Sequence, residues 1–181
     1  MTAASWSLGP SDGVLRIRTG VAGAAARMGH RLTIGVTQWR ATVRWKGDKP
    51  VAAELTVPVD ALQVLQGEGG VTPLTGAEKA IARANALKTL EAKKFPEIRF
   101  SAEEITPTPD GYRLSGSLEI HGRTRPRSVD LRVEDAGDFW QMAVETPVSQ
   151  GEFGVKPYSL LMGTLRVADE VVVSFEGKQA K

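Results

Sequence analysis

The chain contains no cysteine and only two histidines, His30 and His121, among its 181 residues. The absence of cysteine excludes disulfide bonds and thiolate metal sites. A zinc site would therefore have to combine histidine with carboxylate ligands. Each histidine fits a structural hydrogen-bonding role better than a metal-binding or acid–base role. The sequence predicts neither a metal ion nor another cofactor.

The sequence also lacks a long apolar run, an export signal and a strong charge of one sign. No stretch of about 18 apolar residues occurs, so we expect no transmembrane segment. Residues 1–6 contain neither the basic region nor the apolar region of a signal peptide, which favours a cytoplasmic location. The formal net charge of +2 is a mild excess, and it argues against nucleic acid as a partner.

The chain does contain a two-residue alternation of apolar and polar side chains. Between residues 32 and 37, and again between 39 and 46, apolar residues occupy one phase, and mostly basic or hydroxylated residues occupy the other. Such alternation places the two sets on opposite faces of a strand. A sheet with one dry face and one wet face is typical of antiparallel pairing.

The same alternation recurs along most of the chain, and turn signals separate its runs. Glycine, proline and aspartate mark turns at residues 47–50, 107–111 and 135–138. This spacing predicts about eight to ten short strands and favours a barrel or a sandwich. No linker or internal repeat stands out, so residues 1–181 are predicted to form one all-β domain.

One segment follows a helical period instead. Thr75 and Glu78 have the spacing of a capping box, in which each side chain accepts a backbone N–H at the start of a helix. Apolar residues then fall on one side of a 3.6-residue helix, namely Ala77, Ala80, Ile81, Ala84, Leu87 and Leu90. Pro96 stops this pattern. We expect one amphipathic helix at about residues 77–93, packed over an end or a flank of the sheet.

Catalytic motifs are weak in this sequence. No Gly-x-Ser-x-Gly turn is present. The glycine-rich segment 67–70 has neither the spacing nor the lysine of a phosphate-binding loop. Composition alone leaves a Ser-His-Asp triad open, because the order of its members varies between folds. The sequence nevertheless predicts that the protein is not an enzyme.

Three arginines, Arg123, Arg125 and Arg127, alternate beside Pro126. One interpretation is a cationic stripe for a phosphate head group or an anionic membrane surface. The other interpretation, which we favour, is protection of a strand edge, since charges and a proline oppose pairing with another molecule.

Several stretches together resemble the YceI-like, polyisoprenoid-binding family. They are Phe95–Ser101, Gly116–Pro126, Phe153–Val155 and Ala168–Val171, with Trp6 and Gly29-His30 near the start. The resemblance implies an eight-stranded antiparallel, lipocalin-like β-barrel with one inserted α-helix, which holds a long lipid tail in its lumen. It implies no cofactor and no catalytic residue. Many members are periplasmic, whereas this sequence shows no export signal.

One departure from the family concerns a head-group contact. Many members have an arginine two residues before an Asp-Phe-Gly sequence, and here Gln150 and Glu152 occupy the arginine and aspartate positions. No binding residue is therefore carried over by motif. We use the resemblance for one purpose only: it implies that the apolar side chains of the strands face the lumen. The residues then predicted to line the lumen and bind the ligand are Leu15, Ile17, Leu32, Ile34, Val36, Trp39, Ala41, Val43, Leu55, Val57, Phe100, Leu114, Leu118, Ile120, Leu131, Met142, Val144, Val173 and Phe175.

The expected function is non-catalytic binding, carriage or sequestration of a long isoprenoid, quinone-tail or fatty ligand. Each buried methylene contributes roughly 0.8 kcal/mol, while association costs about 4–15 kcal/mol, so a long tail is needed. Two alternatives stay open: a lipid-modifying enzyme that uses the same lumen, and a solid-core β-domain for protein interaction. The sequence also leaves a homodimer open.

Overall fold

The computed structural model describes residues 4–181, which form an all-β fold with one short α-helix. The strands are β1 (Ser5–Leu8), β2 (Gly13–Arg18), β3 (Val21–Ala22), β4 (His30–Val36), β5 (Arg40–Lys46), β6 (Lys49–Pro58), β7 (Leu62–Gly69), β8 (Glu97–Thr108), β9 (Gly111–Ile120), β10 (Arg123–Asp135), β11 (Phe139–Ser149), β12 (Ser159–Leu160), β13 (Leu165–Val167) and β14 (Glu170–Ala180). The helices are α1 (Gly76–Thr89) and the 3₁₀ turns η1 (Ala26–Met28), η2 (Val59–Ala61), η3 (Gly151–Phe153) and η4 (Leu161–Gly163).

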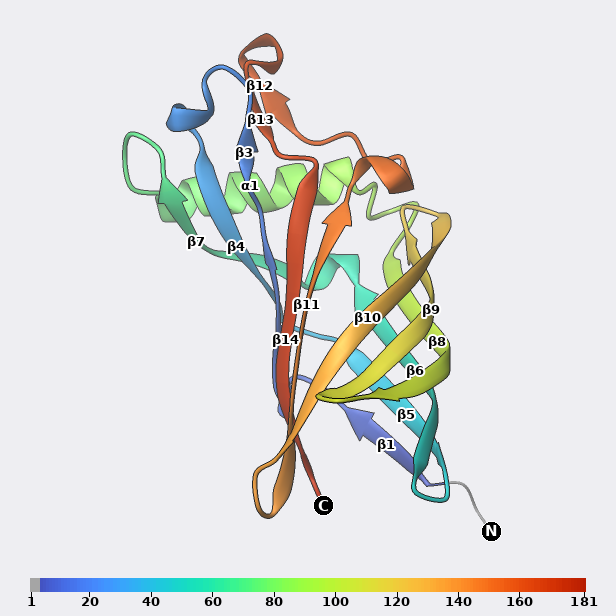
Figure 1. Cartoon of the computed structure of the whole chain (residues 1–181). Coiled ribbons are helices and arrows are strands. Elements are labelled where there is room, and N and C mark those ends of the chain that lie inside the picture. The colour runs from blue at the N-terminus through green and yellow to red at the C-terminus, as the bar shows by residue number, and fades with distance from the viewer. Residues whose placement is uncertain (1–3) are drawn as a thin grey trace.

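Eleven strands form one antiparallel sheet, in the order β1-β5-β6-β8-β9-β10-β11-β14-β2-β4-β7. The sheet curls strongly (Figure 1). β2 pairs with both β14 and β4, and β4 pairs with β7, which continues from β6 after η2. The curl turns one face of the sheet inward, and the apolar phase of the strands lies on that face.

The expected count of eight strands is not confirmed, because several strands are bent and divided. β4–β5 and β6–β7 form one long hairpin, with pairs from His30↔Gly69 to Lys46↔Lys49. A bend interrupts this hairpin where the Thr37 N–H and hydroxyl both donate to the Ala61 carbonyl, at 2.9 and 3.0 Å. The bend redirects the hairpin so that β6 joins β8 while β4 joins β2.

Helix α1 begins where the sequence predicts and ends earlier than predicted. The capping box is present, since the Glu78 N–H donates to the Thr75 hydroxyl and the Thr75 N–H to the Glu78 carboxylate. The expected end near residue 93 is wrong, because the helix ends at Thr89. Glu91 adopts a left-handed φ of 50°, and the N–H groups of Glu91 and Ala92 donate to Lys88 and Leu87. These are the bonds of a Schellman ending, with glutamate where glycine is usual.

The helix and a small second sheet lie at the same end of the curled sheet, opposite β1 and the C-terminus (Figure 1). The Arg83 guanidinium donates to the carbonyls of Leu62 and Asp60, at 2.7 and 2.6 Å, and so fastens α1 to β7 and η2. The second sheet has the order β12-β13-β3. Helix α1 therefore covers an end of the sheet, one of the two placements expected from its amphipathic pattern.

The spacing between β8 and β9 depends on Gly116. Gly116 pairs with Ala102, and a Cβ built on Gly116 would lie 1.7 Å from the Ser101 carbonyl oxygen. We therefore expect Gly116→Ala to lower the free energy of unfolding by about 1–3 kcal/mol, since the backbone must move to admit the methyl group. Urea unfolding followed by circular dichroism measures this change.

Gly76 provides the matched control. It is the first residue of α1, and a Cβ built on it meets no atom within 4 Å. Gly76→Ala should leave the stability unchanged or raise it by up to about 1 kcal/mol, because alanine favours the helix. Equal midpoints for the two variants would contradict the close approach of β8 and β9.

Candidate functional site: an apolar cavity inside the curled sheet

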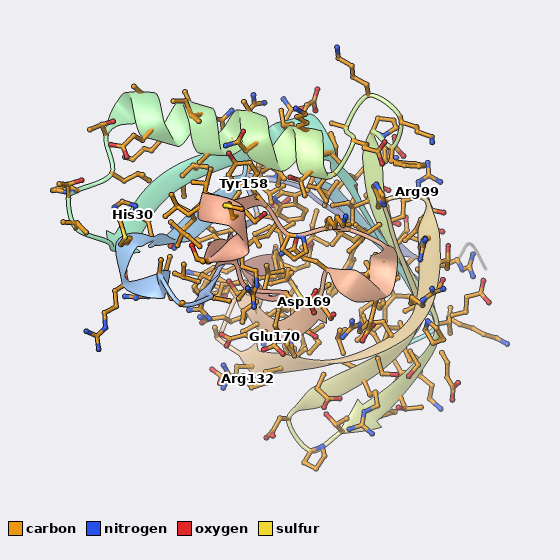
Figure 2. The ribbon with its side chains drawn as sticks, turned by 90° about the horizontal axis from the view of Figure 1, so that it is seen from above. His30, Arg99, Arg132, Tyr158, Asp169 and Glu170 are labelled. Atoms are coloured by element: carbon orange, nitrogen blue, oxygen red, sulfur yellow. The ribbon has the colours of Figure 1, made fainter. Side chains whose placement is uncertain are left out.

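The concave face of the sheet surrounds a cavity of about 770 Å³. Its wall is almost entirely apolar and comes from strands on all sides of the sheet. For comparison, an apolar cavity of about 150 Å³ is enough to bind benzene. Seen from above, the wall encloses a dense ring of side chains, and α1 runs along one side (Figure 2).

All of the side chains predicted from strand phase line this cavity. Trp39, only 5% exposed, lies between β4 and β5 and packs edge-on against Phe175, with ring centroids 5.4 Å apart. Leu15, Ile34 and Met142 are also buried in the same cluster. The strand alternation therefore places these residues around one space, while their contact with a ligand stays a prediction.

The structure adds lining residues that the strand alternation does not mark. The cavity-facing side of α1 supplies Ile81, Ala82, Asn85, Ala86 and Thr89, its C-cap supplies Leu90, and the preceding loop supplies Val71, Thr72 and Leu74. Tyr158 directly precedes β12 and Leu160 lies in it, and Figure 2 shows Tyr158 near the centre of this end. The helical period predicts a different side of α1. That side shares only Ile81 and Leu90 with the lining residues, while Ala77, Ala80 and Ala84 are exposed. The loop residues have no period to read.

The segment after β11 supplies the most deeply buried wall. Phe153 is 0% exposed and Val155 is 3% exposed, and both pack with Val148. Gly154 between them has a left-handed φ of 69°, and a Cβ there would lie 2.7 Å from the Arg123 guanidinium carbon. Phe153, Gly154 and Val155 form one of the stretches that carry the family resemblance, and here that stretch builds the cavity.

Six ionisable residues contribute to the cavity wall. They are His30, Glu54, Glu78, Arg127, Tyr158 and Arg166. Most of them contact the backbone: His30 Nε2 donates to the Thr72 carbonyl at 2.6 Å, and Arg166 donates to the Gly163 carbonyl at 3.0 Å. Among residues 4–181, no three His, Asp or Glu side chains come together as a metal site would require.

His121 lies at the turn between β9 and β10 and takes part in a local network. His121 and Gly122 have left-handed φ values of 55° and 71°, as a two-residue hairpin turn with the twist of the sheet requires. The His121 ring contacts the Glu91 carboxylate through Nε2, donates to the Phe153 carbonyl through Nδ1, and packs edge-on against Phe95. This network joins the end of α1 to the β9–β10 turn and to η3.

The pKa values that depart from their usual range belong to exposed groups outside the cavity wall. A hydrogen bond from Arg113 holds the pKa of Asp130 below its ordinary value, across the β9–β10 pair. Hydrogen bonds from Lys181 and from the Gly137 N–H likewise lower the pKa of Asp135. These carboxylates belong to the outer surface and to no candidate site.

The wall of the cavity has a seam between β10 and β11. β10 pairs with β9 from Arg123 to Arg132, but it pairs with β11 only from Arg132 to Asp135. Above that point the two strands diverge (Figure 1). Arg127 crosses the seam and donates from Nη1 to the Pro147 carbonyl at 2.9 Å. The half of β10 that does not pair with β11 carries Arg123, Arg125 and Pro126. Charged residues and proline are typical of an exposed strand edge, because they oppose pairing with another molecule.

The fold and the cavity define a class of protein: a curled antiparallel sheet that encloses a large apolar space under a short helix. A family model described as the YceI-like domain matches residues 15–178. The chain belongs to the YceI-like family.

Relatives and solved structures agree with this membership. A UPF0312 protein of Yersinia pestis (strain Pestoides F) is 27% identical over 95 residues, which span 51% of this chain and 50% of that relative. The chain thus matches about half the length of such relatives. Burkholderia cenocepacia BcnA has a similar fold, with a TM-score of 0.70 at 18% identity, covering 93% of this chain and 96% of BcnA. A Campylobacter jejuni YceI protein has a TM-score of 0.62 at 10% identity, covering 82% and 84%.

We expect Arg127 to hold the seam together. The Arg127 side chain is 19% exposed, and its stem covers apolar residues of the wall. Arg127→Ala should lower the free energy of unfolding by about 1–3 kcal/mol, because it removes the 2.9 Å hydrogen bond to the Pro147 carbonyl and the packing of the side chain. Urea unfolding measures the loss.

Arg132 offers the control on the same strand. It is exposed at the periphery in Figure 2 and does not line the cavity. Arg132→Ala should change the stability by no more than about 0.5 kcal/mol, as surface substitutions usually do. If the two alanine variants unfold at the same urea concentration, Arg127 does not hold the seam.

Proposed function

We propose that the protein binds a long apolar molecule, such as an isoprenoid, a quinone tail or a fatty chain, inside the cavity and carries or sequesters it without chemical change. The single observation that supports this proposal is the apolar cavity of about 770 Å³ inside the sheet. Membership of the YceI-like family agrees with it.

Burial of methylene groups provides the binding energy in this proposal. About ten buried methylenes contribute roughly 8 kcal/mol, which lies within the association cost of about 4–15 kcal/mol. Only longer chains therefore bind tightly. Small metabolites cannot bury enough apolar surface, so the size of the cavity favours long tails over compact ligands.

The same proposal includes the barrel that the family resemblance implies. When β1–β2, β4–β5 and β6–β7 are each counted as one bent strand, the eleven strands of the main sheet become eight. A lipocalin-like barrel of eight strands has room for one ligand. We keep the cytoplasm as the proposed location and leave a homodimer open. No helix within residues 4–181 combines the length and apolar character needed to cross a bilayer.

The two alternative functions fit the site less well. A solid-core domain would have no cavity, whereas the space inside this sheet is open. An enzyme would need ionisable groups that converge on one point. Here Glu78 caps α1, Arg127 crosses the seam, and His30 contacts the Thr72 carbonyl. These groups come from separate parts of the wall and make different contacts, so no reaction centre is supported.

Extraction and chain-length dependence test the proposal together. Gently purified protein, extracted with organic solvent and examined by mass spectrometry, should release a long-chain lipid. In a series of fatty acids, each added methylene should tighten binding by about 0.8 kcal/mol, or roughly fourfold in Kd, until the cavity is filled. A clean extract combined with no uptake of polyprenyl or acyl ligands would overturn the proposal.

A variant that fills the cavity tests where the ligand sits. Ala41 lines the cavity on β5, between its neighbours Leu8 and Leu55. Ala41→Phe should place a ring in the space that a tail would occupy and raise the Kd for long fatty acids about tenfold or more, since several buried methylenes are lost. Isothermal titration calorimetry measures the Kd.

Val14 supplies the matched control, because it lies on β2 at 50% exposure and does not line the cavity. Val14→Phe adds a ring of the same size on the outside and should leave the Kd unchanged. Equal Kd values for Ala41→Phe and the unaltered protein, with both folded, would place the ligand elsewhere.

A further inference from the structure

Exposed apolar side chains gather at the end of the molecule that α1 covers. The described residues include nine large hydrophobic side chains that are exposed, and only Val14 and Leu65 lie outside this group. The other seven form what we call the apolar rim: Met28, Val71, Ile81, Tyr158, Leu160, Leu161 and Met162. Five of them also line the cavity, so the rim and the lumen share one continuous apolar surface.

The outermost part of the rim is the turn η4 between β12 and β13, which projects from the top of the molecule in Figure 1. Met162 at its tip is fully exposed, and Leu161 is 55% exposed. Leu161 and Met162 have left-handed φ values of 52° and 56°, which residues with large side chains adopt only at a cost. The turn thus holds two apolar side chains in water in a strained backbone.

Hydrogen bonds keep this turn in place. The Thr164 hydroxyl donates to the Leu161 carbonyl at 2.7 Å, and the Arg166 guanidinium donates to the Gly163 carbonyl at 3.0 Å. The Ala25 N–H donates to the Thr164 carbonyl at 2.8 Å, which ties the turn to the segment that carries η1 and Met28. A hydrogen-bonded, strained and apolar projection of this kind indicates a partner that buries it.

Basic residues accompany the rim. Arg27 precedes Met28, Lys156 lies two residues before Tyr158, and Arg166 supports η4; all three are exposed. Within residues 4–181, none of the three lies within 4 Å of a carboxylate. The cations are therefore free to meet an anionic surface.

Acidic residues near this end are mostly engaged with other groups. Glu78 caps α1, and Glu68 lies 4.0 Å from Arg31. Asp169 accepts hydrogen bonds from the Ser149 hydroxyl and from the Gly151 N–H. Glu170 follows it at the start of β14, and Figure 2 labels both. These carboxylates keep their negative charge, but none of them lies within two residues of a rim residue, whereas Arg27 and Lys156 do.

We propose that the apolar rim docks on an anionic lipid bilayer, with Leu161 and Met162 inserted at the boundary between head groups and acyl chains. Apolar side chains flanked by cations are what such an interface binds. This inference rests on the proposed function, because a tail that passes from a bilayer to the lumen along the rim never crosses water. A small projecting turn also suits a bilayer better than a protein partner, whose stable interfaces bury about 1,200–2,000 Å².

Vesicle sedimentation tests the docking surface. Wild-type protein should sediment with vesicles of phosphatidylglycerol and phosphatidylcholine, and less with phosphatidylcholine alone. Replacing both tip residues, Leu161→Ser with Met162→Ser, should weaken binding about tenfold or more, since two apolar side chains leave the acyl boundary. The matched control, Val14→Ser with Leu65→Ser, removes the two exposed hydrophobic residues outside the rim and should bind as wild type does.

Charge variants test the second part of the surface. Arg27→Gln with Lys156→Gln should reduce the preference for phosphatidylglycerol and flatten the decrease of binding with salt, because exposed charges are screened by salt. Thermal melting followed by circular dichroism confirms that each variant is folded before its binding is compared.

Uptake of cis-parinaric acid in buffer without vesicles separates docking from ligand binding. A tip variant that takes up the fatty acid normally but no longer sediments with vesicles supports the proposal. A wild-type protein that takes up the fatty acid but binds no vesicle overturns docking and leaves the proposed function standing. A wild-type dimer in sedimentation velocity that the tip variant loses, without any vesicle binding, also overturns docking and assigns the rim to a second copy.

Discussion

The structure depends on one constraint: the dry face of a single curled sheet has no second layer to cover it and must be covered by the sheet itself. An antiparallel sheet with one apolar face must bury that face against other residues. Here the sheet bends round until its apolar residues face one another. Trp39 and Phe175 pack against each other and both line the cavity, which is the space that the curled sheet leaves unfilled.

The bends and the open seam follow from that curl. The hairpin β4–β5/β6–β7 changes direction at Thr37 and η2, which lets one hairpin contribute to two sides of the wall. The two strands at the seam diverge, so no ladder of backbone hydrogen bonds joins them there. The Arg127 guanidinium instead reaches across the gap and donates to the Pro147 carbonyl. A cationic side chain with a long apolar stem suits this place, because the stem covers the wall while the guanidinium reaches polar partners.

The end that α1 covers differs from the rest of the molecule in its exposed surface. Short elements and turns build it, and apolar side chains there continue from the lumen to the outside. Strained residues also concentrate there, with Leu161 and Met162 in the left-handed region. This end combines an apolar path from the lumen to the outside with a projecting apolar turn.

The sequence by itself determined which side chains share a face and where α1 begins. Those features depend on a period of two or on a cap four residues long, so they are local. Tertiary structure decided where α1 ends. Glu91 occupies the position of the Schellman ending where glycine is usual, and its carboxylate contacts His121, thirty residues away. Tertiary structure also decided that Val71, Tyr158 and Phe153 join the wall, because non-periodic segments acquire neighbours only when the sheet curls and brings distant residues together.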